Sequence, residues 1–155
     1  MASITSREDA VTTDPQAEGE LSHAISRVAR LHRGTAGQLL REMGLYPGQE
    51  LLLMRLWEAG PQRQTELIQL LGLDPSTVTR MVQRLEQAGF VTRRPHPEDR
   101  RAVLVESSDA GNALRDKVGD MWGRLEKRTV AGLSERERRE LARLLARVES
   151  NLGGP

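Results

Sequence analysis

Two short helices, a tight turn and a strand are predicted by TELIQLLGLDPSTVTRMVQRLEQAGFVTRR, which runs from Thr65 to Arg94. The second helix has the clearest start, because Asp74 can accept hydrogen bonds from free backbone amides and Pro75 suits the first helical position. Gly89 ends this helix, since glycine tolerates the positive φ found just past a helix C-terminus. We therefore expect a helix over residues 75–88 that follows a shorter one, which is the order of a helix-turn-helix.

The predicted second helix has an apolar face and a polar face. Its apolar residues recur at the spacing of a buried stripe: Val78, Met81, Val82 and Leu85. Its polar face carries hydroxyls, an amide and two guanidinium groups: Ser76, Thr77, Thr79, Arg80, Gln83 and Arg84. Arginine pairs with guanine, glutamine with adenine, and Ser or Thr reaches base edges or phosphate. A helix N-terminus also attracts phosphate. The polar face therefore predicts DNA contact, against the alternative of an ordinary solvated helix.

A basic hairpin is predicted directly after this helix. Strands are expected over 90–92 and 102–105, and the connection over 93–101 contains two prolines that make it stiff and extended. Arginines flank the connection on both sides, and a narrow minor groove attracts arginine. Asp99 lies two residues before Arg101 and is expected to hold its guanidinium group, so that its own charge does not repel phosphate.

The stretch from 73 to 111, LDPSTVTRMVQRLEQAGFVTRRPHPEDRRAVLVESSDAG, resembles the core of the MarR family of winged-helix transcriptional regulators, including the Asp-Arg-Arg of the wing. The resemblance extends over residues 21–152. It implies a mainly α fold with a small β-hairpin wing (α+β), namely a winged helix-turn-helix with N- and C-terminal dimerisation helices. It also implies an obligate homodimer, in which Arg101 enters the minor groove while Arg100 lies near phosphate. Arg94 of the wing is also expected to contact DNA.

Two stretches depart from the family pattern. Ser107-Ser108 stands where the family usually has Leu-Thr, so an apolar anchor is missing, although Ser108 can still cap the next helix. The first helix of the motif is expected to begin at Gln62-Arg63-Gln64, without the usual cap, so its N-terminus is weakly specified.

Composition limits the chemistry that the chain can perform. Cysteine is absent, which excludes disulfides, zinc-cysteine sites and, by the resemblance, the branch of the family that senses peroxide through cysteine. The net charge is only +1, so DNA affinity must come from local charge. No phosphate-binding loop or nucleophile elbow is present, and the three histidines, His23, His32 and His96, are dispersed. We expect no enzyme activity, no metal and no cofactor.

The chain is expected to form one domain over residues 20–152, after a polar, flexible tail over 1–19. Helices over 20–44 and 109–152 are expected to form the dimer, and residues 49–106 the DNA-binding lobe. Gly34 and Gly37 interrupt the first helix, so that it either bends or packs very closely against a neighbour. No stretch is long enough to span a bilayer and no signal peptide is evident, so we expect a soluble, cytoplasmic protein.

The terminal helices carry more apolar surface than one small lobe can cover, which indicates an interface with a second copy. Twofold pairing would place two recognition helices about 34 Å apart, on an approximately palindromic operator. The sequence therefore predicts a homodimer that binds double-stranded DNA, and the family resemblance implies a transcriptional regulator, expected to be a repressor. The alternatives are a winged-helix protein-interaction module and a constitutive DNA binder without an effector.

A small effector is implied mainly by the family resemblance. Such ligands are often anionic aromatics that bind between the dimer helices and the DNA-binding lobe. The residues expected near this junction, each also interpretable as core, are His32, Leu39, Leu53, Trp57 and Trp122.

Overall fold

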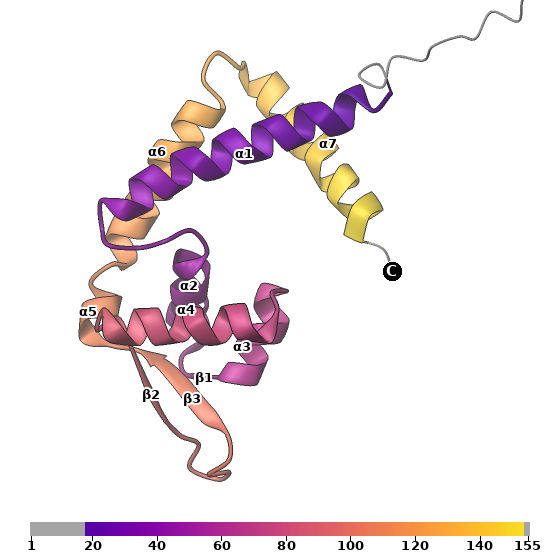
Figure 1. Cartoon of the computed structure of the whole chain (residues 1–155). Coiled ribbons are helices and arrows are strands. Elements are labelled where there is room, and N and C mark those ends of the chain that lie inside the picture. Colours follow the sequence, from indigo (N-terminus) through magenta and orange to yellow (C-terminus); the bar gives the residue numbers. More distant parts are fainter. Residues whose placement is uncertain (1–17, 154–155) are drawn as a thin grey trace, which may run out of the picture.

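The computed structural model describes residues 18–153, so most of the tail expected over 1–19 lies outside the described residues. The helices are α1 (Glu20–Arg41), α2 (Gln49–Ala59), α3 (Gln64–Leu71), α4 (Pro75–Gln87), α5 (Asp109–Asn112), α6 (Arg115–Thr129) and α7 (Glu135–Gly153), and the strands are β1 (Gln62–Arg63), β2 (Val91–Pro95) and β3 (Val103–Ser107). Figure 1 shows α1, α6 and α7 at one end of the molecule, and α2–α4 with the sheet at the other. The fold is mainly helical with a small antiparallel sheet, as the sequence predicted.

An aliphatic core joins the two ends of the molecule. Leu39 and Leu40 of α1 pack in one cluster with Leu52 and Leu53 of α2 and with the apolar face of α4. Val118, Met121 and Leu125 extend the same cluster into α6. The terminal helices therefore meet the lobe of α2–α4 and the sheet through packed apolar side chains.

Helix α1 continues through both glycines, and only one of them is in close contact. A Cβ added at Gly37 would lie 3.2 Å from Cγ of Pro47, whereas at Gly34 it would meet no atom within 4 Å. Close packing, rather than a bend, is therefore the reason for glycine at position 37. The chain then turns through Gly44 and Gly48, both at positive φ, into α2.

The sheet has three antiparallel strands in the order β1-β3-β2. The prediction for the region before α3 was wrong, since Gln62 and Arg63 pair with Val105 and Leu104 of β3 and the helix begins at Gln64. A two-residue strand has no periodicity to detect, and only its partner defines it. The hairpin strands are also longer than expected, because pairing runs from Val91–Ser107 to Pro95–Val103.

The single helix predicted after the wing is divided into α5 and α6. The amide of Leu114 donates to the carbonyl of Gly111, three residues back, so the regular helical pattern is interrupted there. Gly111 itself packs against the chain, because an added Cβ would lie only 2.1 Å from the carbonyl oxygen of Phe90. Ser108 caps α5 as predicted, accepting from the amide of Gly111 at 3.0 Å.

Ser107 has a role that the sequence did not reveal. Its hydroxyl accepts a hydrogen bond from Nε1 of Trp57 at 3.3 Å. The serine at the position where the resembled family has leucine therefore bonds the end of β3 to α2.

Helix α7 begins with the predicted capping box, in which the Ser134 amide donates to the Glu137 carboxylate at 2.8 Å. None of its residues is buried. Large apolar side chains are exposed along the outer half of α1 and along α7: Leu21, Ile25, Val28, Leu31, Leu141, Leu144, Leu145 and Leu152. We call these eight residues the terminal apolar surface. Among residues 18–153, none of the helices has the length and hydropathy that a bilayer crossing requires.

Candidate nucleic-acid interface

Helix α4 is held at its start by Asp74, as the sequence predicted. The Asp74 carboxylate accepts from the Thr77 amide at 2.9 Å and from the hydroxyls of Ser76 and Thr77, each at 2.5 Å. These hydrogen bonds, with the Ser76 hydroxyl contributing most, hold the pKa of Asp74 well below its usual range. The carboxylate is therefore ionised at neutral pH.

The two faces of α4 are also as predicted. Val78, Met81, Val82 and Leu85 are buried, while Arg80, Gln83 and Arg84 are exposed. Thr77 and Thr79 are half-buried instead, and the Thr79 hydroxyl accepts from Nε2 of Gln64 at 3.2 Å. The Thr79 side chain therefore links α4 to α3.

Tyr46 is a part of this surface that sequence reasoning missed. The guanidinium carbon of Arg84 lies 5.9 Å from the centre of the Tyr46 ring, within the range of a cation–π contact. Tyr46 and Gln49 border a shallow groove along α4, together with Thr77, Arg80 and Arg84. The only signal in the sequence was that the chain's single tyrosine falls in the loop before α2.

Two of the wing arginines are paired inside the protein. Arg93 binds the Glu86 carboxylate of α4 through Nη2 at 2.6 Å and through Nε at 2.8 Å. Arg94 binds Glu106 across the hairpin at 3.3 Å. Arg93 therefore ties the wing to the recognition helix, and the charge of Arg94 is partly compensated before any DNA arrives.

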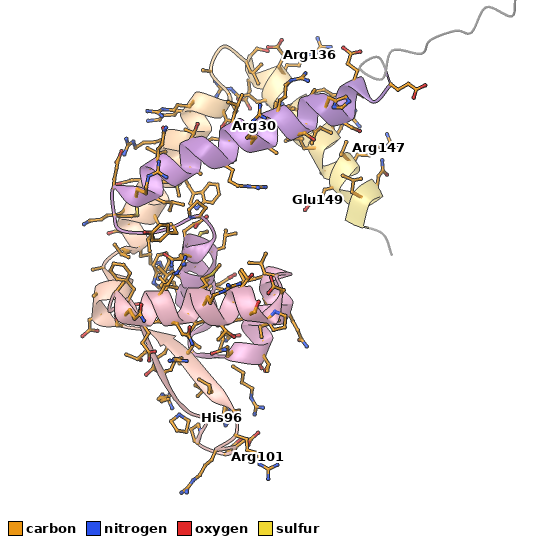
Figure 2. The ribbon with its side chains drawn as sticks, viewed as in Figure 1. Arg30, His96, Arg101, Arg136, Arg147 and Glu149 are labelled. Carbon is orange, nitrogen blue, oxygen red and sulfur yellow. The ribbon has the colours of Figure 1, made fainter. Side chains whose placement is uncertain are left out.

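Arg100 and Arg101 lie at the tip of the wing, and Figure 2 shows Arg101 pointing away from the body of the molecule. Within the described part of the chain, no carboxylate lies at ion-pair distance from either guanidinium group. The expectation that Asp99 holds the Arg101 guanidinium was wrong. Asp99 accepts from the Arg101 backbone amide at 3.1 Å instead, because the tight turn brings the amide to the carboxylate and directs the side chain outward.

The residues expected near the effector junction separate into two groups. Trp57 and Trp122 border one cavity of about 740 Å³ between α2 and α6, together with Met54, Glu58, Arg115, Asp116, Val118, Gly119 and Asp120. Leu39 and Leu53 do not border it, since both are enclosed in the core. His32 lies on α1 and does not border it either. The sequence placed Leu39 and Leu53 near this junction because both are apolar residues of the helices expected there. In the structure both side chains point into the core instead.

Over residues 18–153, no three His, Asp, Glu or Cys side chains gather into a group that could hold a metal ion. The arrangement instead consists of a capped helix with exposed arginines beside a hairpin with two free arginines at its tip. These features define a winged helix-turn-helix DNA-binding protein.

Comparison with known proteins agrees with this class. The model of the MarR family matches residues 45–103. The organic hydroperoxide resistance transcriptional regulator of Bacillus subtilis is 34% identical over 106 residues, which are 68% of this chain and 69% of that protein. The HTH-type transcriptional repressor NicR of Pseudomonas putida is 28% identical over 129 residues, 83% of this chain and 82% of that protein. A crystal structure of a mutant MarR from E. coli in complex with operator DNA superposes with a TM-score of 0.80 at 27% identity, covering 89% of this chain and 100% of that one.

The chain belongs to the MarR family, and it is a DNA-binding transcriptional regulator. Its relatives are regulators rather than enzymes.

Proposed function

We propose that this regulator is a homodimeric repressor that binds a pseudo-palindromic operator. Helix α4 enters the major groove of each half-site and the wing places Arg101 in the adjacent minor groove. The observation that carries the proposal is the exposure of Arg80, Gln83 and Arg84 on α4, beside a wing whose tip arginines have no carboxylate partner among the described residues.

The dimer is supported by the terminal apolar surface. Leu21 and Leu152 are each 79% exposed, and Leu145 is 53% exposed. Monomeric soluble proteins rarely leave so many large apolar side chains together in water, and a twofold dimer is the commonest way to cover them. The same axis would repeat α4 on the second half-site, which is the reason to expect an approximate palindrome. Repression is supported by similarity to a protein named as a repressor.

The experiment is selection of bound sequences from a random duplex pool with the full chain, followed by affinity measurements on the selected site. We expect a palindromic consensus with half-site centres about one helical turn apart. Arg80→Ala should relax the preference at one position of each half-site, whereas Thr129→Val on α6 should leave the consensus unchanged. Two results together would contradict the proposal and favour the protein-interaction module. No duplex sequence would be enriched in the pool, and the protein would bind duplex DNA no more tightly than it binds heparin.

A second proposal concerns the effector, and it follows from the cavity between α2 and α6. Two indole rings and Met54 offer apolar contact for a flat ring. The cavity is bordered by three carboxylates, Glu58, Asp116 and Asp120, against one guanidinium, Arg115. We infer that a neutral or cationic aromatic compound suits this cavity better than the anionic aromatic that the family resemblance implies, because an anion would meet net negative charge.

A ligand there would release DNA only by binding the non-operator arrangement more tightly than the operator-bound one. Titration of a panel of matched aromatic amines, alcohols and carboxylates against the protein–operator complex tests this. The amines or alcohols should lower DNA affinity in the wild type and have less effect on Trp122→Ala. If no compound changes DNA affinity, the protein is a constitutive binder.

A further inference from the structure

Three hydroxyl groups at the start of α4 have their protons committed inside the protein. Ser76 donates to Oδ1 of Asp74 and Thr77 donates to Oδ2, both at 2.5 Å. Thr79 donates to the carbonyl oxygen of Pro75 at 2.8 Å. A hydroxyl has one proton to donate and two lone pairs to accept with, so each of these groups is left with acceptor capacity only.

The partners fix the direction of these bonds. An ionised carboxylate and a backbone carbonyl accept hydrogen bonds and cannot donate them. The proton in each contact must therefore come from the hydroxyl. Asp74 keeps its charge because the same contacts favour the ionised form.

A hydroxyl that can only accept is a poor partner for phosphate, because phosphate oxygens also accept. In the major groove, the donors are the N6 amino group of adenine and the N4 amino group of cytosine, whereas thymine O4 and guanine O6 accept. Every base pair carries one amino and one keto base. An acceptor at a fixed place in the groove therefore distinguishes which strand bears the amino base.

We propose that Asp74 presets Ser76 and Thr77 as hydrogen-bond acceptors, so that this end of α4 selects adenine or cytosine over guanine or thymine on the strand it faces. Ser76 and Thr77 are specificity-determining residues, and Asp74 is the positioning residue that acts through them. Thr79 is excluded from this role, because its hydroxyl also accepts a hydrogen bond from Gln64 inside the protein. The inference rests on the proposed placement of α4 in the major groove.

The test uses the full chain and the operator selected from the random pool. Each adenine of a half-site is replaced in turn by purine, and each cytosine by 2-pyrimidinone, which removes the amino group and keeps the ring. At one position the loss of the amino group should weaken wild-type binding by about 5- to 150-fold, the cost of a mismatched pair. The same replacement should cost little in Ser76→Ala combined with Thr77→Val. Exchange of adenine for cytosine there should cost less than exchange for guanine or thymine.

Asp74→Asn provides a variant that retains the cap, since asparagine still offers one oxygen to the Thr77 amide. The asparagine NH₂ group can donate to one of the two hydroxyls, and that hydroxyl is then free to donate its own proton to the DNA. The preference for adenine or cytosine over guanine or thymine should therefore weaken. Circular dichroism confirms that the variant is folded. The control for removing a hydrogen-bonded hydroxyl is Thr129→Val on α6. In the wild type the Thr129 hydroxyl donates to the Leu125 carbonyl at 2.9 Å, away from α4.

Three results would overturn the inference. One is an operator whose affinity survives removal of every amino group, and another is an unchanged base preference in Asp74→Asn. The third is a uniform weakening on all sequences in Ser76→Ala, with the salt slope reduced by about 1, which would indicate a phosphate contact. In each case the wild type still selects an operator, so the proposed function stands. Absence of any selection removes both.

Discussion

Arg101 differs from Arg93 and Arg94 of the wing because its guanidinium group has no carboxylate partner among the described residues. Arg94 is partly compensated by Glu106, whereas Arg101 points outward from a turn that Asp99 holds through the backbone. We expect Arg101→Ala to weaken operator binding about tenfold, or about 1.4 kcal/mol, and Arg94→Ala to weaken it less. Fluorescence anisotropy on one labelled duplex at fixed salt measures both. Equal losses of affinity from the two substitutions would mean that the ion pair between Arg94 and Glu106 breaks when the protein binds DNA.

Asp74 makes the stability of α4 depend on pH. Because its folded-state pKa is depressed, its contribution is present above the unfolded pKa, about 3.9, and is lost as pH falls further. Asp74→Ala should therefore lower the melting temperature at neutral pH, and the gap from the wild type should narrow between pH 4 and pH 3. Thermal melts followed by circular dichroism across this range provide the measurement. If the difference in melting temperature between the wild type and Asp74→Ala stays constant down to pH 3, the stabilisation by Asp74 does not depend on its negative charge.

The charged residues of the site were identifiable from the sequence, but their partners were not. Glu86 and Arg93 are seven residues apart, on a helix and on a strand, and Arg94 reaches Glu106 only through the register that aligns Thr92 with Glu106. Such pairs are set by tertiary geometry. The sequence therefore predicted five arginines for DNA, and the structure leaves four of them, Arg80, Arg84, Arg100 and Arg101, without an ion pair among the described residues.

Among the elements, α4 and α7 were predictable because their signals are local. Asp74 with Pro75, and Ser134 with Glu137, satisfy free amides within three residues of chain. The strand β1 and the division between α5 and α6 depend on contacts with residues far along the chain, Val105 and Phe90 respectively. No pattern within a short window contains that information.

Gly111 should be the least replaceable glycine of α5 and α6. The methyl group of an alanine there would clash with the carbonyl oxygen of Phe90. The backbone of α5, which connects the wing to α6, would therefore have to move. We expect Gly111→Ala to lower the free energy of unfolding by about 1–3 kcal/mol, the usual cost of overpacking. Gly123→Ala on α6 is the matched control, because its Cβ meets no atom within 4 Å. It should instead raise stability by roughly 0.5–1 kcal/mol.

Urea unfolding of the two glycine variants, followed by circular dichroism, separates the effects. Two variants that change stability in the same direction would argue against the close approach of Gly111 and Phe90. A reduced operator affinity in Gly111→Ala, at temperatures where it is fully folded, would further indicate that this joint sets the position of the wing.

For the whole molecule, the proposed dimer makes Leu145 a residue whose substitution should change assembly without unfolding the protomer. Its side chain is 53% exposed on α7, a helix without buried residues. We expect Leu145→Arg to shift the protein from dimer to monomer at micromolar concentration, as measured by sedimentation velocity. Leu70→Arg on α3 is the control, since Leu70 is 52% exposed but lies outside the terminal apolar surface. A Leu145→Arg protein that remains dimeric would place the interface elsewhere.

The charge of the dimer gives a second, independent measure of assembly on DNA. Four arginines without an ion pair in each of two protomers, eight in all, predict a slope of about −7 for the logarithm of affinity against the logarithm of salt concentration, if each neutralises one phosphate. A monomeric Leu145→Arg protein should show about half that slope, because only one recognition helix and one wing remain on the duplex. Anisotropy titrations on the same operator over a range of KCl concentrations measure both slopes. An unchanged slope in a monomer would mean that one protomer already makes all the phosphate contacts, and the paired arrangement on DNA would be wrong even if the free protein is a dimer.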